Sequence, residues 1–543
     1  MQDRLNTSTE TMISIQDLSK GFERENLFEN LNLVFHPGDK IAFVGKNGSG
    51  KTTFFNCLTG KESFDGRILI SDLKISLMEQ EKNFSNLDKT FEEYLEDKKK
   101  EIEKQKKNLE EQIGNPESYE NEEKFNSLLD EYNLLLTNPA LKIEQGSIKK
   151  ILKELNMDKD VLKEKIKNLS GGQKTKLRLA ECLSKKADLY LLDEPTNNLD
   201  LITREWLENY VNEKIKSLIV ISHDRYFMNK VAEKVWDLEN KDIKEWPYKF
   251  AEYIEKKKHH LKGLEKKYKD AKKEQARLLE AAKARRDQMS NLYNPTLAKR
   301  LERDAAKYDD VANPSDFIKE INVDFGAKDL HNCTIFRLED VSKKFDKVLF
   351  KEVNQEISFG DKVCIVGENG TGKSTLLKIL IGKIQASKGE VYRRKDVRIG
   401  YFDQELKGID KEKTVMQLFV EETRKEEERL VPILLKYGFE KGSFNKKIKH
   451  LSGGEKGRLN ILRIALAKNN ILILDEPTNN LDLYLIESLE NALKQFEGTI
   501  VFISHDRYFV DKIATRILEI KGKKITGFRG NYTEYLEHNQ ERN

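Results

Sequence analysis

The chain has 543 residues, of which 38% are hydrophobic and 35% are charged, and its formal net charge is +4. This length predicts about three or four domains, and the high charged fraction predicts long solvated helices. A membrane-spanning or secreted protein is excluded because no apolar run approaches the ~18 residues of a membrane helix, the N-terminus has no apolar signal region, and the four cysteines form no CxxC pair. We therefore expect a cytoplasmic protein that makes no membrane contact.

Four motifs occur twice, in the same order. They are GxxxxGK[ST] at 45–52 and 367–374, LSGG at 169–172 and 451–454, LDEPTNNLD at 192–200 and 474–482, and ISHDRYF at 221–227 and 503–509. In both halves, 23 residues separate the serine of LSGG from the aspartate of LDEP, and 30 separate that aspartate from the histidine. This agreement predicts two homologous domains, 12–246 and 334–530, joined by a linker, 247–333, and followed by a short tail, 531–543.

GxxxxGK[ST] is the pattern of a phosphate-binding loop, and each copy follows an apolar strand and begins a helix, as the motif requires. Its glycines allow the backbone N–H groups to face phosphates; they are Gly45, Gly48, Gly50, Gly367, Gly370 and Gly372. We expect Lys51 and Lys373 to reach the β- and γ-phosphates. The hydroxyls of Thr52 and Ser374 are expected to bind Mg²⁺.

The first domain contains about 42 more residues than the second, and they fall within 83–141. This segment predicts two charged helices, about 89–112 and 119–135, on either side of a Gly-Asn-Pro turn at 114–116. We expect a helical hairpin, or arm, that projects from the first domain. The alternative is a solvated decoration without a function, which is disfavoured because so charged a hairpin gains little stability by itself.

The glycines of the two LSGG motifs begin helices that are rich in lysine and arginine, and an exposed helix N-terminus suits an anion. Each domain already has a phosphate loop, so this second anion site must serve the nucleotide of the other domain. We therefore predict a monomer whose domains pair head to tail. Ser452 would then contact the γ-phosphate held by Lys51, and Ser170 the one held by Lys373.

Two apolar strands, 189–193 and 471–475, end in carboxylates. Asp193 and Asp475 are expected to hold Mg²⁺ through its water shell. The next residues, Glu194 and Glu476, are suited to orient and polarise an attacking water. His223 and His505 follow the strands 217–222 and 499–504, where an imidazole is placed to sense the γ-phosphate.

The linker carries the basic charge of the chain. Residues 248–310 contain 18 Lys and Arg against 11 Asp and Glu, a net charge of +7, which leaves −3 for the remainder. Its first helix, about 249–289, has an apolar seam at coiled-coil spacing, interrupted at Lys257 and Gln275. A break at 290–295 precedes a return helix, 296–312, whose apolar side faces back.

Basic side chains gather where the two linker helices meet, together with one tyrosine. They are Lys283, Arg285, Arg286, Tyr293, Lys299, Arg300 and Arg303. Clustered cations with an aromatic ring suit an RNA backbone and unstacked bases. The alternative is a basic coiled coil that is merely solvated.

These motifs resemble the ATP-binding cassette (ABC) superfamily. The tandem cassettes, the repeated PTNNLD, the charged linker and the arm resemble its ABC-F proteins, which act on ribosomes. The resemblance assigns Phe22 and Phe345 to stacking on adenine, and Gln80 and Gln404 to the metal. It also assigns further nucleotide contacts in the phosphate loops and signatures: Asn47, Thr53, Asn369, Thr375, Gly171, Gly172, Gly453 and Gly454.

The fold that the resemblance implies is α/β, with two P-loop cassettes that have parallel core sheets, joined by a helical coiled-coil linker. The implied function is an ATPase in which two Mg-ATP close the cassettes and the closed form binds the ribosome. Its linker would act on rRNA, P-site tRNA and the peptidyl-transferase region, in a translation factor or an antibiotic-resistance ribosomal protection protein. The rival reading is a soluble ATPase subunit that energises a separate membrane transporter. A DNA-repair ATPase is a weaker alternative, because those carry far longer coils.

Overall fold

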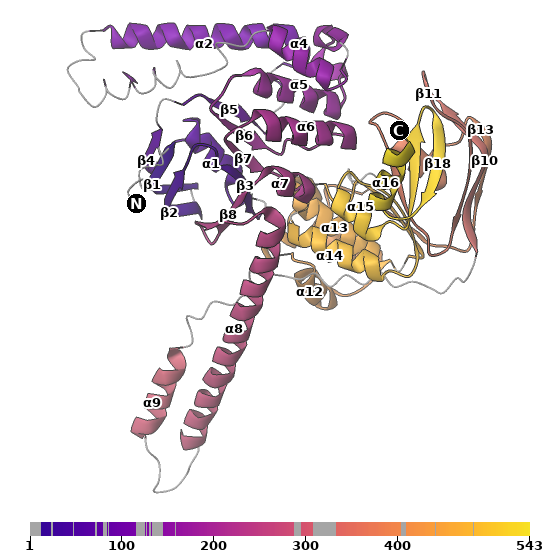
Figure 1. The fold of residues 1–543 in the computed structure, drawn as a ribbon. Helices are drawn as coiled ribbons and strands as arrows, with labels where there is room; N and C mark the ends of the chain where they lie inside the picture. The colour runs from indigo at the N-terminus through magenta and orange to yellow at the C-terminus, as the bar shows by residue number, and fades with distance from the viewer. Residues whose placement is uncertain are drawn as a thin grey trace, which may run out of the picture.

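The computed structural model describes the chain except residues 1–11, 23–24, 47, 71–72, 80–83, 85, 116–124, 126–127, 130–131, 133–144, 158, 287–294, 308–332, 403–408, 440, 468, 480, 482 and 543. Four predicted site residues therefore lie outside the described residues: Asn47, Gln80, Tyr293 and Gln404. Two α/β domains lie side by side, and a long helical hairpin extends away from them (Figure 1).

The first cassette is built on a six-stranded sheet of order β5-β6-β7-β3-β8-β9. All neighbours in it are parallel except β8 and β9. Its strands are β3 (Lys40–Gly45), β5 (Ile75–Met78), β6 (Leu189–Asp193), β7 (Leu218–Ile221), β8 (Lys234–Glu239) and β9 (Asp242–Trp246). Strands β6 and β7 are buried along their whole length, which is why they appear in the sequence as continuous apolar runs.

An antiparallel sheet and several helices complete this cassette. The sheet has the order β2-β1-β4 and consists of β1 (Ile13–Phe22), β2 (Glu25–Phe35) and β4 (Asp65–Ile70). The helices are α1 (Lys51–Leu58), α4 (Gln145–Glu154), α5 (Gly171–Ser184), α6 (Leu201–Lys214) and α7 (Arg225–Val231). The phosphate loop, Asp193 and His223 follow β3, β6 and β7. These three strands are parallel neighbours, so the residues meet at one edge of the sheet.

The second cassette repeats this topology, with sheets of order β14-β15-β16-β12-β17-β18 and β11-β10-β13. Its strands are β10 (Thr334–Lys344), β11 (Val348–Ser358), β12 (Lys362–Gly367), β13 (Lys388–Arg393), β14 (Ile399–Phe402), β15 (Ile471–Asp475), β16 (Thr499–Ile503), β17 (Arg516–Lys521) and β18 (Lys524–Arg529). Its helices are α10 (Lys373–Leu380), α11 (Val415–Thr423), α12 (Glu427–Lys436), α13 (Gly453–Leu466), α14 (Leu483–Gln495), α15 (Arg507–Ile513) and α16 (Tyr532–Arg542). The predicted duplication of an α/β unit is thus confirmed.

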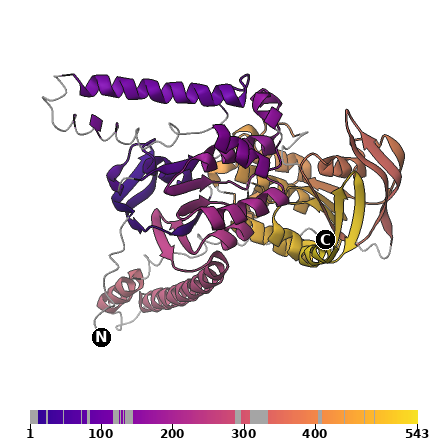
Figure 2. The ribbon, with the colours of Figure 1, turned by 45° about the horizontal axis from the view of Figure 1, so that its top comes forward.

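The first arm helix is confirmed as α2 (Phe91–Ile113). It begins with a capping box, in which the Thr90 hydroxyl accepts the backbone N–H of Glu93 and the Glu93 carboxylate accepts that of Thr90. The predicted second arm helix, 119–135, lies largely outside the described residues. Within it, the Tyr132 hydroxyl donates to the Glu110 carboxylate on α2 at 2.8 Å, as two adjacent legs require. Figure 2 shows α2 along one edge of the molecule, on the side of the first cassette.

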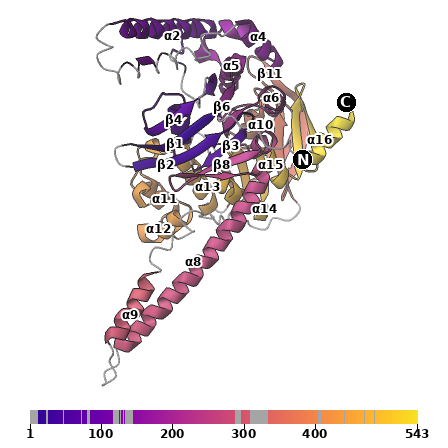
Figure 3. The same cartoon turned by 60° about the vertical axis from the view of Figure 1, so that its left-hand side comes forward.

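The linker hairpin consists of α8 (Phe250–Arg286) and α9 (Pro295–Ala306). The predicted helix ends at 287–289 and 308–312 lie outside the described residues. The 37 residues of α8 span about 55 Å, and the helix projects away from both cassettes with α9 alongside it (Figures 1 and 3). One predicted interruption of the seam has a structural role, since the Gln275 amide donates to the carbonyl of Ala305 on α9 at 3.3 Å. Within the described ranges, no helix combines the length and apolarity that crossing a membrane would require.

Candidate active sites

Each phosphate loop holds a lysine ammonium over its own backbone. Lys51 Nζ donates to the carbonyls of Gly45 and Lys46, both at 2.9 Å. Lys373 Nζ donates to Gly367 and Glu368 at 2.7 and 3.0 Å. Each loop ends in a left-handed glycine, with φ of 101° at Gly50 and 103° at Gly372. A side chain at either position would be strained, so the tight turn into the helix explains why glycine stands there.

A hydroxyl and a carboxylate meet beside each loop. Thr52 Oγ1 donates to Asp193 Oδ2 at 2.7 Å, and Ser374 Oγ donates to Asp475 Oδ1 at 3.0 Å. Asp193 Oδ1 is buried and has no hydrogen-bond partner. Burial raises the pKa of Asp193 to about 7, against the hydrogen bond from Thr52 that lowers it. An unsatisfied buried oxygen next to a hydroxyl fits a hard cation such as Mg²⁺.

Protein groups alone would not complete such a cation site. Among the described residues, no group of three or more His, Cys, Asp and Glu side chains is arranged to hold a metal ion. Mg²⁺ typically takes one or two protein ligands and completes its shell with phosphate oxygens and water. The pair of oxygen donors therefore suits an ion that arrives with a nucleotide.

A glutamate and a histidine face each other in both cassettes. Glu194 Oε1 lies 3.3 Å from His223 Nε2, and its Oε2 accepts the His223 backbone N–H at 3.3 Å. Glu476 and His505 repeat both contacts at the same distances. Both glutamates adopt a left-handed backbone with φ of 50°, which is rare for this residue type. A costly conformation that occurs at the same point of both repeats indicates a functional constraint.

Burial sets the protonation of these groups. It raises the pKa of Glu194 to about 7, although the nearby Lys51 ammonium lowers it. It likewise raises the pKa of Glu476 to about 7, opposed first by Arg204 and then by Lys373. Burial also holds the pKa of His505 well below its ordinary value, so this imidazole is neutral at pH 7. A carboxyl group with a raised pKa and a neutral imidazole can both accept protons.

The predicted head-to-tail contact occurs in one half of the interface. The Asn369 amide, in the second phosphate loop, donates to the Asn198 carbonyl of the first cassette at 2.9 Å. A Cβ on Gly172 would lie 2.8 Å from that carbonyl and 3.1 Å from the Asn369 amide. The LSGG motif that contains Ser170, called the Ser170 signature below, therefore lies against the phosphate loop that carries Lys373. The contacts of Ser170 and Ser452 with the γ-phosphates held by Lys373 and Lys51 stay predictions.

Ser170 and Ser452, the serines of the two LSGG motifs, also cap their helices. The Ser170 hydroxyl accepts the Gln173 backbone N–H at 3.3 Å and begins α5. Ser452 does the same at the start of α13, accepting from Glu455 at 3.3 Å. The following glycines, Gly171 and Gly453, are the first residues of these helices. Both predicted helix N-termini are thus formed, and their role in binding an anion stays a prediction.

Residues that follow His223 and His505 join the cassettes. Arg225 pairs with Glu490 and, at 3.3 Å, with Asp506 of the second cassette. In the pseudo-symmetric position, Arg507 pairs with Glu208 at 3.3 Å. The Tyr226 and Tyr508 rings lie 5.8 Å apart between these pairs. This set of contacts was not predicted from the sequence, although the repeated ISHDRYF motif contains both arginines and both tyrosines.

The two predicted adenine-stacking aromatics are exposed. Phe22 ends β1 and is 55% exposed, and Phe345 directly follows β10 and is 54% exposed. A lysine ammonium lies near each ring, at 5.0 Å for Lys20 and 4.6 Å for Lys343. Neither ring belongs to a hydrophobic core, so both are accessible for stacking.

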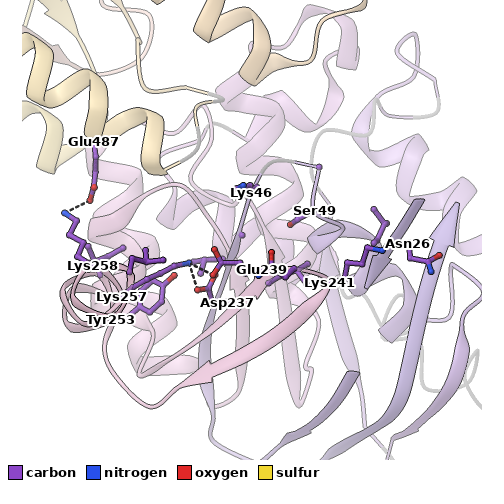
Figure 4. Close-up of a pocket in the computed structure, with 18 residues that line it drawn as sticks. Asn26, Lys46, Ser49, Asp237, Glu239, Lys241, Tyr253, Lys257, Lys258 and Glu487 are labelled. Carbon is purple, nitrogen blue, oxygen red and sulfur yellow. Dashed lines mark hydrogen bonds and ion pairs between the residues drawn. The ribbon is translucent and has the colours of Figure 1, made fainter. Parts of the chain in front are cut away.

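A pocket of about 290 Å³ lies between the first phosphate loop, the end of β8 and the base of the linker (Figure 4). Lys257 lines this pocket, and its Nζ pairs with Asp237 at 2.5 Å and with Glu239 at 3.4 Å. The next residue, Lys258, pairs with Glu487 of the second cassette at 3.0 Å. The base of α8 therefore forms ion pairs with both cassettes. Lys257, the polar residue that interrupts the apolar seam of the linker helix, makes the pairs with the first cassette.

The predicted basic residues lie at the far end of the hairpin. Lys283, Lys299, Arg300 and Arg303 are exposed. Arg285 and Arg286 are the last two residues of α8, and Tyr293 lies outside the described residues. Figures 1 and 3 show the ends of α8 and α9 well away from both phosphate loops.

Comparisons with known proteins agree with this architecture. The ABC transporter family matches residues 28–197 and 350–479, which contain the phosphate loops and the strands that end in Asp193 and Asp475. The chain is 31% identical to ABC transporter F family member 2 of Arabidopsis thaliana, over 98% of this chain and 80% of that protein. It is 30% identical to ribosome protection protein VmlR of Bacillus subtilis, over 95% of this chain and 87% of that protein. Its fold is similar to that of the archaeal ribosome recycling factor aABCE1 in complex with the ribosomal stalk protein aP1, with a TM-score of 0.59, 18% identity, and coverage of 96% of this chain and 92% of that one.

Proposed function

The chain belongs to the ABC-F family of tandem ABC ATPases, and on that premise we propose that its ATP-bound, closed form binds the ribosome. The linker would then act on rRNA, P-site tRNA and the peptidyl-transferase region, in a cytoplasmic translation factor or an antibiotic-resistance ribosomal protection protein. The name of its relative, ribosome protection protein VmlR, supports this assignment. The observation that carries the proposal is that one hairpin is bonded to both cassettes at its base and presents exposed cations at its distant end.

We assign the phosphate-binding role to Lys51 and Lys373 and the metal-binding role to the hydroxyl–carboxylate pairs beside them. Bound Mg²⁺ would neutralise phosphate charge. Glu194 and Glu476 orient the attacking water and accept its proton, while His223 and His505 hold those carboxylates in place. The two cassettes close around two ATP molecules, and hydrolysis reopens them.

Removing charge from the linker tip tests the proposal. Lys283, Lys299, Arg300 and Arg303 are changed to alanine together. Folding and basal ATPase activity should survive, because these exposed side chains lie outside both phosphate loops. Ribosome binding should weaken, and its dependence on log salt should become shallower by roughly 0.7–0.9 for each lost phosphate contact. Ribosome pelleting across a salt series measures both.

A matched control places the same loss of charge near the cassettes. Lys262, Lys266, Lys267 and Lys269 are exposed on α8 nearer its base. Changing these four to alanine should leave ribosome binding and its salt slope much closer to the unmodified protein. If the two variants weakened ribosome binding equally, the hairpin would contribute only its overall positive charge, and its tip would have no specific role. Recovery of the unmodified protein with membranes instead of ribosomes would favour the transporter reading.

The base of the linker should be sensitive to the loss of Lys257. Lys257→Met leaves the carboxylate of Asp237 buried without this cation, which should lower the free energy of unfolding by about 3–5 kcal/mol. Adding Asp237→Asn removes the unpaired charge and should recover most of that loss. Thermal unfolding of the two variants measures the difference. An unchanged midpoint for Lys257→Met alone would show that the pair does not anchor α8.

A further inference from the structure

Arg204 is a feature that the two cassettes do not share. It lies in the first turn of α6 and is only 6% exposed. The corresponding helix, α14, has isoleucine at this place, because Leu201 aligns with Leu483 and Arg204 therefore aligns with Ile486. One turn further along, Glu208 and Glu490 correspond, so this helix keeps the acidic residue of the interface in both cassettes but the arginine in the first one only.

The Arg204 guanidinium connects three segments. Its Nε donates to the Leu199 carbonyl at 3.1 Å. Its Nη1 donates to the Asp224 carboxylate and to the His505 carbonyl, both at 2.8 Å. The first two partners belong to the first cassette. The third belongs to the loop between β16 and α15 of the second cassette, which we call the switch loop.

Two of these contacts, those with Leu199 and His505, lead to the second active site, and the third partner, Asp224, caps α7 of the first cassette. Leu199 follows Asn198, whose carbonyl accepts the amide of Asn369 in the second phosphate loop. His505 contacts the Glu476 carboxylate with both its backbone N–H and its imidazole. The guanidinium therefore lies between the loop that abuts the second phosphate loop and the loop that holds the second glutamate.

The contact is fixed because its partners are buried. Asp224 is 8% exposed and balances the charge of Arg204. A guanidinium has several donors in a rigid plane, so it can satisfy two carbonyls and a carboxylate at once. A side chain without donors would leave the His505 carbonyl without this bond and Asp224 without this cation.

We propose that Arg204 is a positioning residue for the second active site, which consists of Lys373, Glu476 and His505 together with the Ser170 signature. It fixes the switch loop of the second cassette against the first, and it touches no reacting atom. Ile486 has no donor, so the first active site lacks an equivalent contact from α14. The two sites consequently differ in how strongly hydrolysis depends on the interface. This inference rests on the glutamate roles given under the proposed function.

Turnover measured separately at each site tests the inference. In Glu194→Gln only the second site hydrolyses ATP, and in Glu476→Gln only the first does. Arg204→Met in the first background should lower kcat by about tenfold or more, as misplacement of a catalytic group does, with KM changed less than about twofold. In the second background kcat should stay within about twofold. Arg204→Lys keeps a cation and should restore part of kcat at the second site.

Two further variants separate positioning from general damage. Glu208→Gln alters the same helix and the same interface but contacts Arg507 instead of the switch carbonyl, so it should show no preference between sites. If Arg204→Met folds poorly, adding Asp224→Asn removes the unpaired acid, and the loss at the second site should persist in Glu194→Gln. Equal losses at both sites, or no loss at the second, would overturn the inference. Full activity of both Glu→Gln backgrounds would instead refute the glutamate roles, and it would overturn with them the positioning role of Arg204 that rests on those roles.

Discussion

Replacing both Glu194 and Glu476 by glutamine is expected to stop ATP hydrolysis while ATP binding persists. Glutamine has the same shape and still offers a carbonyl oxygen to the switch-loop N–H, but it cannot accept a proton from water. General-base catalysis contributes about 10²–10⁴-fold, so turnover should fall at least about a hundredfold. Measured ATPase activity and nucleotide binding report the two effects separately.

The same double variant should be at least as stable as the unmodified protein. Burial raises the pKa of both carboxyl groups to about 7, so ionising them at and above neutral pH is costly in the folded state. A neutral amide avoids that cost. An unchanged or higher melting temperature would therefore accompany the loss of turnover, which separates a catalytic defect from misfolding.

Ribosome pelleting then links the defect to the proposed function. With ATP bound and hydrolysis blocked, the closed form should accumulate, so the double variant should pellet with ribosomes more than the unmodified protein does. The single variants serve as controls, since each retains one hydrolysing site. If the double variant pelleted no more than the unmodified protein in ATP, closure would not be what the ribosome recognises.

The repeated motifs made the active sites predictable from the sequence. A strand that is buried on both faces consists of a continuous run of apolar residues. In a parallel sheet, the carboxyl ends of such strands lie at one edge. Lys51, Asp193 and His223 each follow one of these runs, so the sequence already indicated that they meet. The contacts of Thr52 with Asp193 and of Glu194 with His223 bear out that placement.

Arg204 and Lys257 could not be predicted in the same way. Arg204 appears once, outside every repeated motif, and its partners lie in three different segments. Lys257 appears in the sequence only as a polar interruption of an apolar seam, because its acidic partners are far from it along the chain. Periodicity reports which face of a helix is buried, but it does not report which buried ion pair that face completes.

Changing both phosphate-loop lysines to alanine should have the largest effect on nucleotide binding. Lys51 and Lys373 are both held over their loops, and each is expected to contact phosphate oxygens directly. A hydrogen bond to a charged group contributes about 1.5–3 kcal/mol, which corresponds to roughly 10–150-fold weaker binding at each site. ATPase activity of the double variant should be lost, and binding of a nonhydrolysable ATP analogue should weaken by that factor at each site.

Lys46→Glu is the matched control for this prediction. It lies in the same loop, but the second phosphate loop has Glu368 at the corresponding position, so a cation there is not part of the repeated arrangement. Reversing that charge should alter analogue binding far less than Lys51→Ala does, although Lys46→Glu changes the loop charge by −2 and Lys51→Ala changes it by only −1. If the two variants lost affinity equally, the phosphate would be responding to the overall charge of the loop. Normal turnover in the double alanine variant would show that neither lysine contacts the phosphates, and the assignment of both active sites would have to be abandoned.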